Sequence, residues 1–195
     1  MKLRFSGFLY DKGWLNSYVS REPLNRVNEP IPWVTYSFID FIEDRLRSHM
    51  RLMEFGSGNS TLYYSKRVAQ VTAVEHDGAW CKRLKDKILP NVQLLHCELV
   101  YGGDYARMAK RTGGNYDIII VDGRDRVNCV SESIEALNES GVVVLDDSER
   151  REYEEVFTTM EKHGFKRLDL WGFAPGVYEY KCTTIFYRSQ NILGI

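Results

Sequence analysis

Two short apolar runs constrain the fold of this chain more than any other feature. They lie in YDIIIVDG (116–123) and GVVVLDD (141–147), and within each run every position is apolar rather than every second one. A strand of this kind belongs to a parallel sheet that is covered on both faces. Since both runs are far shorter than the ~20 residues of a membrane span, they predict buried strands of one α/β domain.

The rest of the sequence alternates between strand-like and helix-like segments. Before the first strand, Val34, Phe38, Ile42 and Leu46 form an apolar stripe, which predicts a helix from Trp33. Further strands are predicted at 51–55, 71–76, 91–97, 165–173 and 181–188, and further helices at 60–69, 78–89, 104–112, 125–140 and 149–163.

Alternating strands and helices indicate βαβ units, so most of the strands should run parallel. No helix separates the last two strands, which are joined by APGVYEY with its Pro-Gly turn signal. We therefore predict a doubly wound, mostly parallel sheet of seven strands, with an antiparallel C-terminal hairpin strand between the fifth strand and the strand from Phe165.

Composition limits the class of protein. The chain has 195 residues, a net charge of −1 and no long apolar segment, which fits one domain without a bias toward nucleic acid or membrane. Residues 1–32 are predicted to be an irregular lid segment, and residues 33–195 the ligand-binding domain. We expect a cytoplasmic protein with a small-molecule substrate; the oligomeric state stays open, a homo-oligomer included.

The segment RLMEFGSGNST (51–61) suggests where a ligand binds. Ligands of doubly wound sheets bind beyond the carboxyl ends of the strands, and here Gly56 and Gly58 allow a tight turn after the first strand. The Lys-Ser/Thr of a P-loop is missing, and Thr61 stands where a dinucleotide fingerprint has its third glycine. Glu54 places a carboxylate beside the turn, which suits a cationic group such as an amine.

The motifs EFGSGNS, VEHD and VDG at successive strand ends, together with the final hairpin, resemble class I S-adenosylmethionine-dependent methyltransferases. The resemblance covers about residues 33–187 and implies S-adenosylmethionine as cofactor. It implies that Glu54 and the glycine turn hold the methionine part, that Glu75 binds the ribose hydroxyls with His76 beside them, and that an acid after the third strand meets the adenine amine. The implied cofactor-binding residues are Glu54, Gly56, Ser57, Gly58, Asn59, Ser60, Glu75, His76 and Asp104, with Asp104 preferred over Glu98.

Acids after the fourth and fifth strands resemble the metal site of catechol-type and macrolide-sugar O-methyltransferases. In that reading Asp122, Asp146 and Asp147 hold Mg²⁺, and Asp122 or Asp125 acts as the base. Asp125 stands where the catechol enzymes carry a lysine. In the alternative reading, Arg124 or Arg126 neutralises these carboxylates without a metal.

The function that the resemblance favours is O-methylation of a small molecule or sugar. Two alternatives remain: another S-adenosylmethionine-using transferase, of N-methyl or aminopropyl type, and a non-catalytic nucleotide- or nicotinamide-binding module. Trp80 is expected in the core rather than beside adenine.

Overall fold

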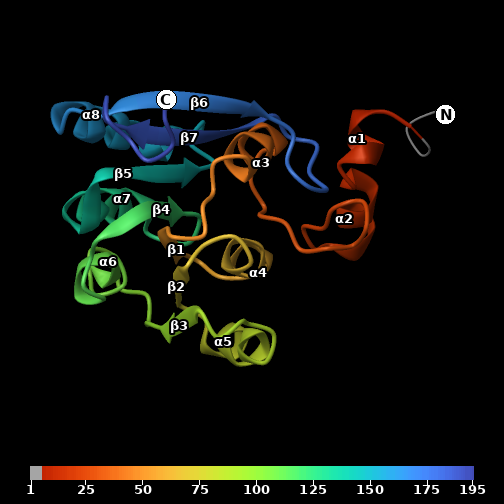
Figure 1. The fold of residues 1–195 in the computed structure, drawn as a ribbon, viewed down its shortest axis with the longest axis horizontal. Helices are drawn as coiled ribbons and strands as arrows, with labels where there is room; N and C mark the ends of the chain where they lie inside the picture. The colour runs from red at the N-terminus through yellow and green to blue at the C-terminus, as the bar shows by residue number, and fades with distance from the viewer. Residues whose placement is uncertain (1–5) are drawn as a thin grey trace.

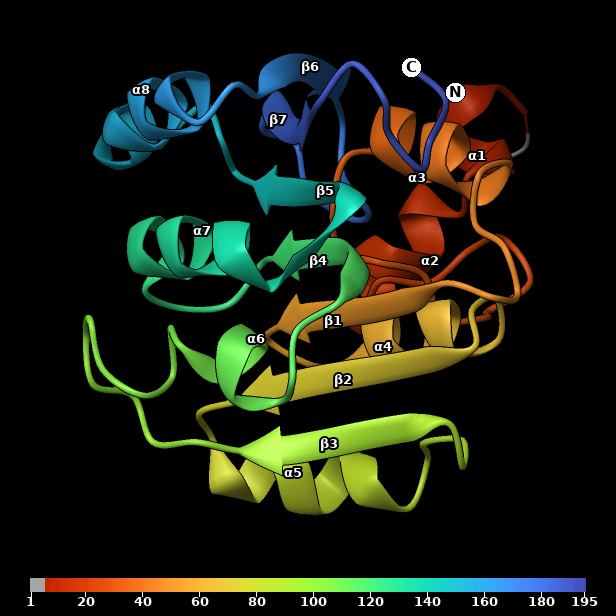
Figure 2. The same cartoon turned by 60° about the vertical axis from the view of Figure 1, so that its left-hand side comes forward.

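A computed structural model describes residues 6–195, and its centre is one seven-stranded sheet with the strand order β3-β2-β1-β4-β5-β7-β6. Strands β1 to β5 run parallel to one another, and β7 runs antiparallel between β5 and β6 (Figure 2). The predicted sheet, with its antiparallel hairpin strand, is confirmed. The strands are β1 (Arg51–Phe55), β2 (Gln70–Glu75), β3 (Val92–His96), β4 (Tyr116–Val121), β5 (Leu137–Asp146), β6 (Lys166–Gly172) and β7 (Lys181–Tyr187).

Helices cover both faces of this sheet, with α3, α4 and α5 on one side and α6, α7 and α8 on the other (Figure 1). Strand β4 shows why its residues are apolar throughout. Ile118 and Ile120 belong to the apolar cluster on the α3–α4 side, whereas Ile119 and Val121 belong to the cluster on the α7–α8 side. The helices are α1 (Phe8–Asp11), α2 (Trp14–Ser20), α3 (Tyr36–Glu43), α4 (Asn59–Ser65), α5 (Gly78–Lys85), α6 (Met108–Arg111), α7 (Arg126–Ser133) and α8 (Glu154–Lys162).

The first predicted helix begins later than its apolar stripe suggests. Thr35 caps α3 by accepting a hydrogen bond from the main-chain N–H of Phe38, so the helix starts at Tyr36. The stripe is buried as expected, and its last member, Leu46, lies beyond the end of the helix at Glu43.

The predicted helix over 125–140 ends early. Helix α7 stops at Ser133, a short 3₁₀ turn follows, and β5 already begins at Leu137. Leu137 pairs with Tyr116 at the start of β4, and the side chain of Asn138 donates to Asp117 at 2.7 Å. Sheet pairing therefore overrides the local helical pattern of these residues.

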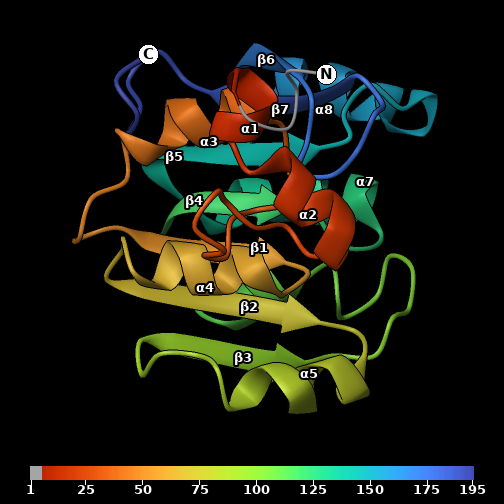
Figure 3. The same cartoon turned by 90° about the vertical axis from the view of Figure 1, so that its right-hand side faces the viewer.

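The segment 1–32 is not irregular throughout, because the described part contains α1 and α2; residues 1–5 lie outside the described range. Two indoles attach the N-terminal region to the β6–β7 loop. Trp14 Nε1 donates to the carbonyl of Val177 at 3.0 Å, and Trp33 Nε1 donates to that of Pro175 at 2.8 Å. Figure 3 shows α2 near the arrowhead end of the sheet. The division of the chain at residue 32 stays a prediction.

Within residues 6–195, no helix combines the length and the apolar character that a membrane crossing requires.

Candidate functional site

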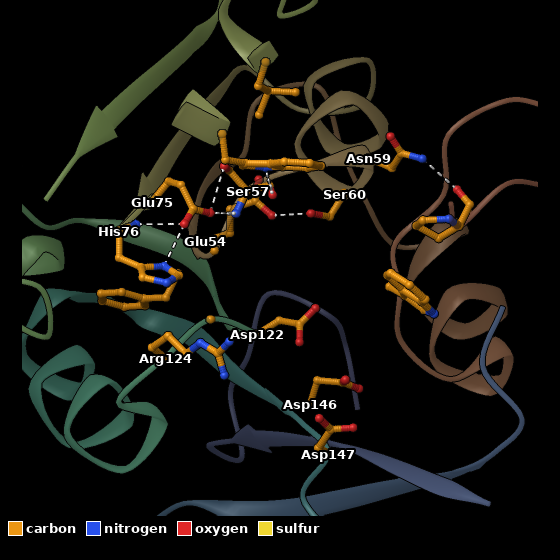
Figure 4. A pocket seen from close by; sticks show the side chains of 18 of the residues that line it. Glu54, Ser57, Asn59, Ser60, Glu75, His76, Asp122, Arg124, Asp146 and Asp147 are labelled. Atoms are coloured by element: carbon orange, nitrogen blue, oxygen red, sulfur yellow. Dashed lines mark hydrogen bonds and ion pairs between the residues drawn. The ribbon is translucent and has the colours of Figure 1, made fainter. Parts of the chain in front are cut away.

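A cavity of about 670 Å³ opens at the carboxyl ends of β1, β2, β4 and β5. The strand order reverses between β1 and β4, so the cavity lies at the switch point where doubly wound sheets bind ligands. Its volume is within the range of small-molecule sites. Figure 4 shows two groups of acids across the open space: Glu54 and Glu75 on one side, and Asp122, Asp146 and Asp147 on the other.

The glycine turn after β1 combines a positive φ angle with a close approach to a neighbouring turn, and glycine permits both. Gly56 has φ +95°, and a Cβ there would lie 3.2 Å from the Cα of Gly123 in the neighbouring turn. A Cβ at Gly58 would meet only Trp80, at 3.7 Å. Gly56 is therefore needed for the turn itself. Gly58, which has no side chain, leaves its main-chain atoms accessible from the cavity, next to Trp80.

Glu54 is a buried acid of the cavity wall with one unpaired oxygen. It is 2% exposed, one carboxylate oxygen accepts a hydrogen bond from Ser60 Oγ at 2.7 Å, and the other oxygen is buried without a partner. Burial raises the pKa of Glu54 to about 7, against the lowering effect of its hydroxyl neighbours. A buried oxygen without a donor is costly, and a cationic ligand group would relieve that cost.

Glu75 is also buried, but its oxygens have partners. One accepts from the main-chain N–H and the hydroxyl of Ser57, both at 3.2 Å. The other accepts from the main-chain N–H groups of His76 and Asp77, and lies 2.7 Å from His76 Nδ1. Glu75 thus fixes the glycine turn and the start of α5 from the end of β2.

Asn59 has a role that its motif does not reveal. Its side-chain amide donates to the carbonyl of Pro23 at 3.0 Å, so the start of α4 holds the segment that follows α2. The cavity is lined on this side by Arg21, Glu22 and Pro23. Residues of the predicted lid segment therefore form part of the cavity wall.

Two of the predicted site residues do not reach the cavity. The exposed carboxylate of Asp104 pairs with Arg111. Asp125 is buried, and its carboxylate accepts from the main-chain N–H of Gly102 at 2.8 Å and from Asn128 at 2.7 Å. Neither acid is among the lining residues, so the geometry does not support Asp104 beside a ligand or Asp125 as a base. Both side chains follow strand ends, but their loops turn them toward other partners.

The acids after β4 and β5 do converge, as predicted. Arg126 lies between them: its guanidinium is 3.0 Å from Asp122 Oδ1 and 3.2 Å from Asp147 Oδ2. Burial and the charge of Asp146 raise the pKa of Asp122 well above its usual range, against the effect of Arg126. Of the three acids Asp122 is the least covered, with 28% of its side chain exposed.

A residue missing from the predicted site, Lys181, lies between the other two acids. Its ammonium is 2.5 Å from Asp147 Oδ1 and 3.3 Å from Asp146 Oδ2, and 14% of its side chain is exposed. Burial alone would raise the pKa of Asp147, but the hydrogen bond and charge of Lys181, with Arg126, lower it overall. The predicted antiparallel hairpin could have indicated this contact, because the start of β7, where Lys181 lies, is then beside the end of β5.

The carboxylates do not fit the expected Mg²⁺ site. Asp147 already contacts Lys181, Arg126 and Arg150, and Asp146 accepts from Thr183 Oγ1 at 2.7 Å. In the part of the chain that the structure describes, no group of three His, Cys, Asp or Glu is arranged to hold a metal ion. The alternative, in which an arginine neutralises these carboxylates without a metal, agrees with the position of Arg126 between Asp122 and Asp147.

The expectation that Trp80 lies in the core is wrong. Trp80 is 39% exposed, lines the cavity, and donates from Nε1 to the carbonyl of Ser57 at 2.8 Å. The guanidinium of Arg83 lies 4.9 Å from the centre of its ring. The pair forms a flat, cationic wall at the start of α5.

Comparisons with known proteins agree with this architecture. No protein-family model matches the chain, and no curated protein matches it. Among solved structures, a methyltransferase-like protein from Silicibacter pomeroyi superposes with a TM-score of 0.61 at 19% identity, over 83% of this chain and 90% of the other. An rRNA methylase from Streptococcus thermophilus gives 0.57 at 12% identity, over 76% and 92%.

A third structure contains a ligand. It is a provisionally assigned methyltransferase from Streptococcus mutans in complex with SAH, with a TM-score of 0.57 at 13% identity, over 76% of this chain and 94% of the other. Together with the strand order and the antiparallel β7, these similarities show that the chain has the Rossmann-like fold of class I S-adenosylmethionine-dependent methyltransferases.

Proposed function

We propose that the protein transfers a methyl group from S-adenosylmethionine to an oxygen of a small molecule or sugar. The observation that carries the proposal is the buried oxygen of Glu54 without a hydrogen-bond partner beside the glycine turn. The amino group of the cofactor's methionine part would supply the missing donor and positive charge. The fold supports the same ligand, because its cavity lies at the switch point.

The other end of the cofactor would lie against β2 and α5. Two of the groups that contact Glu75 are side chains, Ser57 Oγ and His76 Nδ1, whereas the others are main-chain N–H groups of the glycine turn and of the two residues after β2. Ribose hydroxyls can replace the side-chain donors without disturbing the main chain. Trp80 and Arg83 would then form the wall beside the adenine.

S-adenosylmethionine supplies an activated methyl group, so the protein has to orient the acceptor and take its proton. Asp122 is suited to receive that proton, since it is partly exposed in the cavity and its pKa is raised by burial and by Asp146. Arg126 holds one of its oxygens at 3.0 Å, which keeps the carboxylate in place.

A dinucleotide would fit the turn less well. Thr61 is fully buried where the fingerprint has its third glycine, and its hydroxyl accepts from the main-chain N–H of Gly58 at 3.0 Å. A nicotinamide ligand would also place its pyrophosphate near the carboxylate of Glu54. These contacts favour a ligand that is cationic at this point.

The proposal is tested by ligand-induced thermal stabilisation. S-adenosylhomocysteine should raise the melting temperature in proportion to its affinity, and NAD⁺ should not. Glu54→Ala and Gly58→Val should abolish binding of S-adenosylhomocysteine in calorimetry while the proteins stay folded. Glu22→Ala, at an exposed acid of the same wall, and Gly172→Ala, at a glycine outside the cavity, are the matched controls. Stabilisation by NAD⁺ alone, or wild-type affinity in both site variants, would refute the cofactor assignment.

The acceptor needs a separate experiment, because proteins with this fold include an rRNA methylase. Purified protein with S-adenosylmethionine should methylate members of a panel of vicinal diols, sugars and phenols, detected by mass spectrometry. An RNA fragment belongs in the same panel. Methylation of RNA or of amines only would replace the proposed acceptor class and leave the cofactor assignment unchanged.

A further inference from the structure

The three acids at the acceptor side of the cavity face an equal number of cationic groups. Asp122, Asp146 and Asp147 lie opposite Arg126, Lys181 and Arg150. Arg150 is at the rim, with 49% of its side chain exposed, whereas Arg126 and Lys181 are mostly buried. The protein itself therefore supplies the cations that contact these acids.

Lys181 is placed by the sheet rather than by a flexible loop. In the β5–β7 pairing Thr183 lies opposite Asp146, and Lys181 is two residues away on the same face of the strand. Thr183 Oγ1 donates to one oxygen of Asp146, and the ammonium of Lys181 contacts the other. Strand β7 thus supplies both a hydrogen bond and a charge to the end of β5.

We infer that Lys181 is a built-in cation that takes the place of a divalent metal between Asp146 and Asp147. The inference rests on the proposed function only in treating this end of the cavity as the acceptor side. Lys181 is a positioning residue, because its ammonium contacts Asp147. Asp147 in turn shares the guanidinium of Arg126 with Asp122, the acid that we place beside the acceptor. Acceptor chemistry in this cavity is then independent of metal.

Removing the ammonium would leave Asp146 and Asp147 close together with one buried cation, Arg126. Carboxylates in that situation repel each other unless a proton or cation joins them. Hard oxygen ligands bind divalent ions more tightly as their uncompensated charge increases. A variant without Lys181 should therefore gain a metal site that the wild type lacks.

Binding of Mn²⁺ to the cofactor-free protein, followed by electron paramagnetic resonance, tests this directly. Wild type should show no specific site, whereas Lys181→Ala should bind one Mn²⁺ at least about tenfold more tightly than any residual, non-specific binding to wild type. Lys181→Arg should retain the wild-type behaviour because it keeps the charge. Lys166→Ala, at an exposed lysine of β6, is the control.

Specific Mn²⁺ binding to wild type that disappears in Asp146→Asn would overturn the inference, and this measurement needs no Lys181 variant to fold. A folded Lys181→Ala protein that binds no Mn²⁺ would overturn it as well. In the enzyme assay, turnover should be unchanged by EDTA. Because the Mn²⁺ measurement uses neither cofactor nor acceptor, its outcome is independent of whether S-adenosylhomocysteine binds.

Discussion

Replacing Glu54 by glutamine should stabilise the cofactor-free protein at alkaline pH and at the same time weaken ligand binding. The carboxylate is fully buried, and burial raises its pKa from 4.5 to about 7. One pH unit of such a difference corresponds to about 1.4 kcal/mol. Ionised Glu54 therefore costs the folded protein about 3 kcal/mol.

The sign of the pH dependence follows from proton binding. Between pH 4.5 and about 7, folded Glu54 holds a proton that the unfolded chain has already released, so the free energy of unfolding decreases as pH rises through this window. Glutamine has no proton to lose. We compare the free energy of unfolding of Glu54→Gln with that of wild type at each pH. Between about pH 4.5 and pH 8 this difference should change by about 3 kcal/mol in favour of the variant.

The assay is urea unfolding at a series of pH values, with and without S-adenosylhomocysteine. A bound amino group should keep Glu54 ionised, so the ligand should stabilise wild type increasingly between about pH 6 and pH 8 and should not do so in Glu54→Gln. Glu22→Gln, at an exposed acid of the same cavity, should follow wild type throughout. Parallel stability curves for wild type and Glu54→Gln across this range would refute the reasoning.

Three further variants test other contacts. Asp125→Asn should lower the free energy of unfolding by about 1 kcal/mol, measured in urea, because the hydrogen bond from Gly102 weakens, and methyl transfer should persist; its loss would mean that Asp125 acts in catalysis. Asp104→Ala should leave the affinity for S-adenosylhomocysteine unchanged in calorimetry, and weaker binding would restore a cofactor role for this acid. Gly176→Ala should speed proteolysis of the β6–β7 loop, because φ is +69° and the new Cβ would lie 2.8 Å from main-chain atoms of Ser17; an unchanged rate would show that this contact does not hold the loop.

Much of the fold was predictable because it depends on short-range patterns. The apolar period gives the type of each element, and the absence of a helix between the last two strands requires an antiparallel hairpin. Strand ends of a parallel sheet meet at one edge, so the motifs alone predict that Glu54, Glu75 and Asp122 line one site. The misplaced boundary of α7 shows where such patterns fail, because the pairing of Leu137 with Tyr116 is a long-range effect.

What the sequence by itself determined was therefore the order of the elements, the glycine turn and the edge of the sheet where ligands bind. Only the tertiary structure decided what each carboxylate contacts. Asp122 directly follows β4, whereas Asp104 and Asp125 lie further along the loops after β3 and β4, and these loops turn them to partners outside the cavity. Lys181 reaches Asp147 from a distant part of the chain, through the register of β7 against β5. Side-chain direction in loops and contacts across strands carry no local period, and for that reason the neutralised acids of this site appear only once the chain is folded.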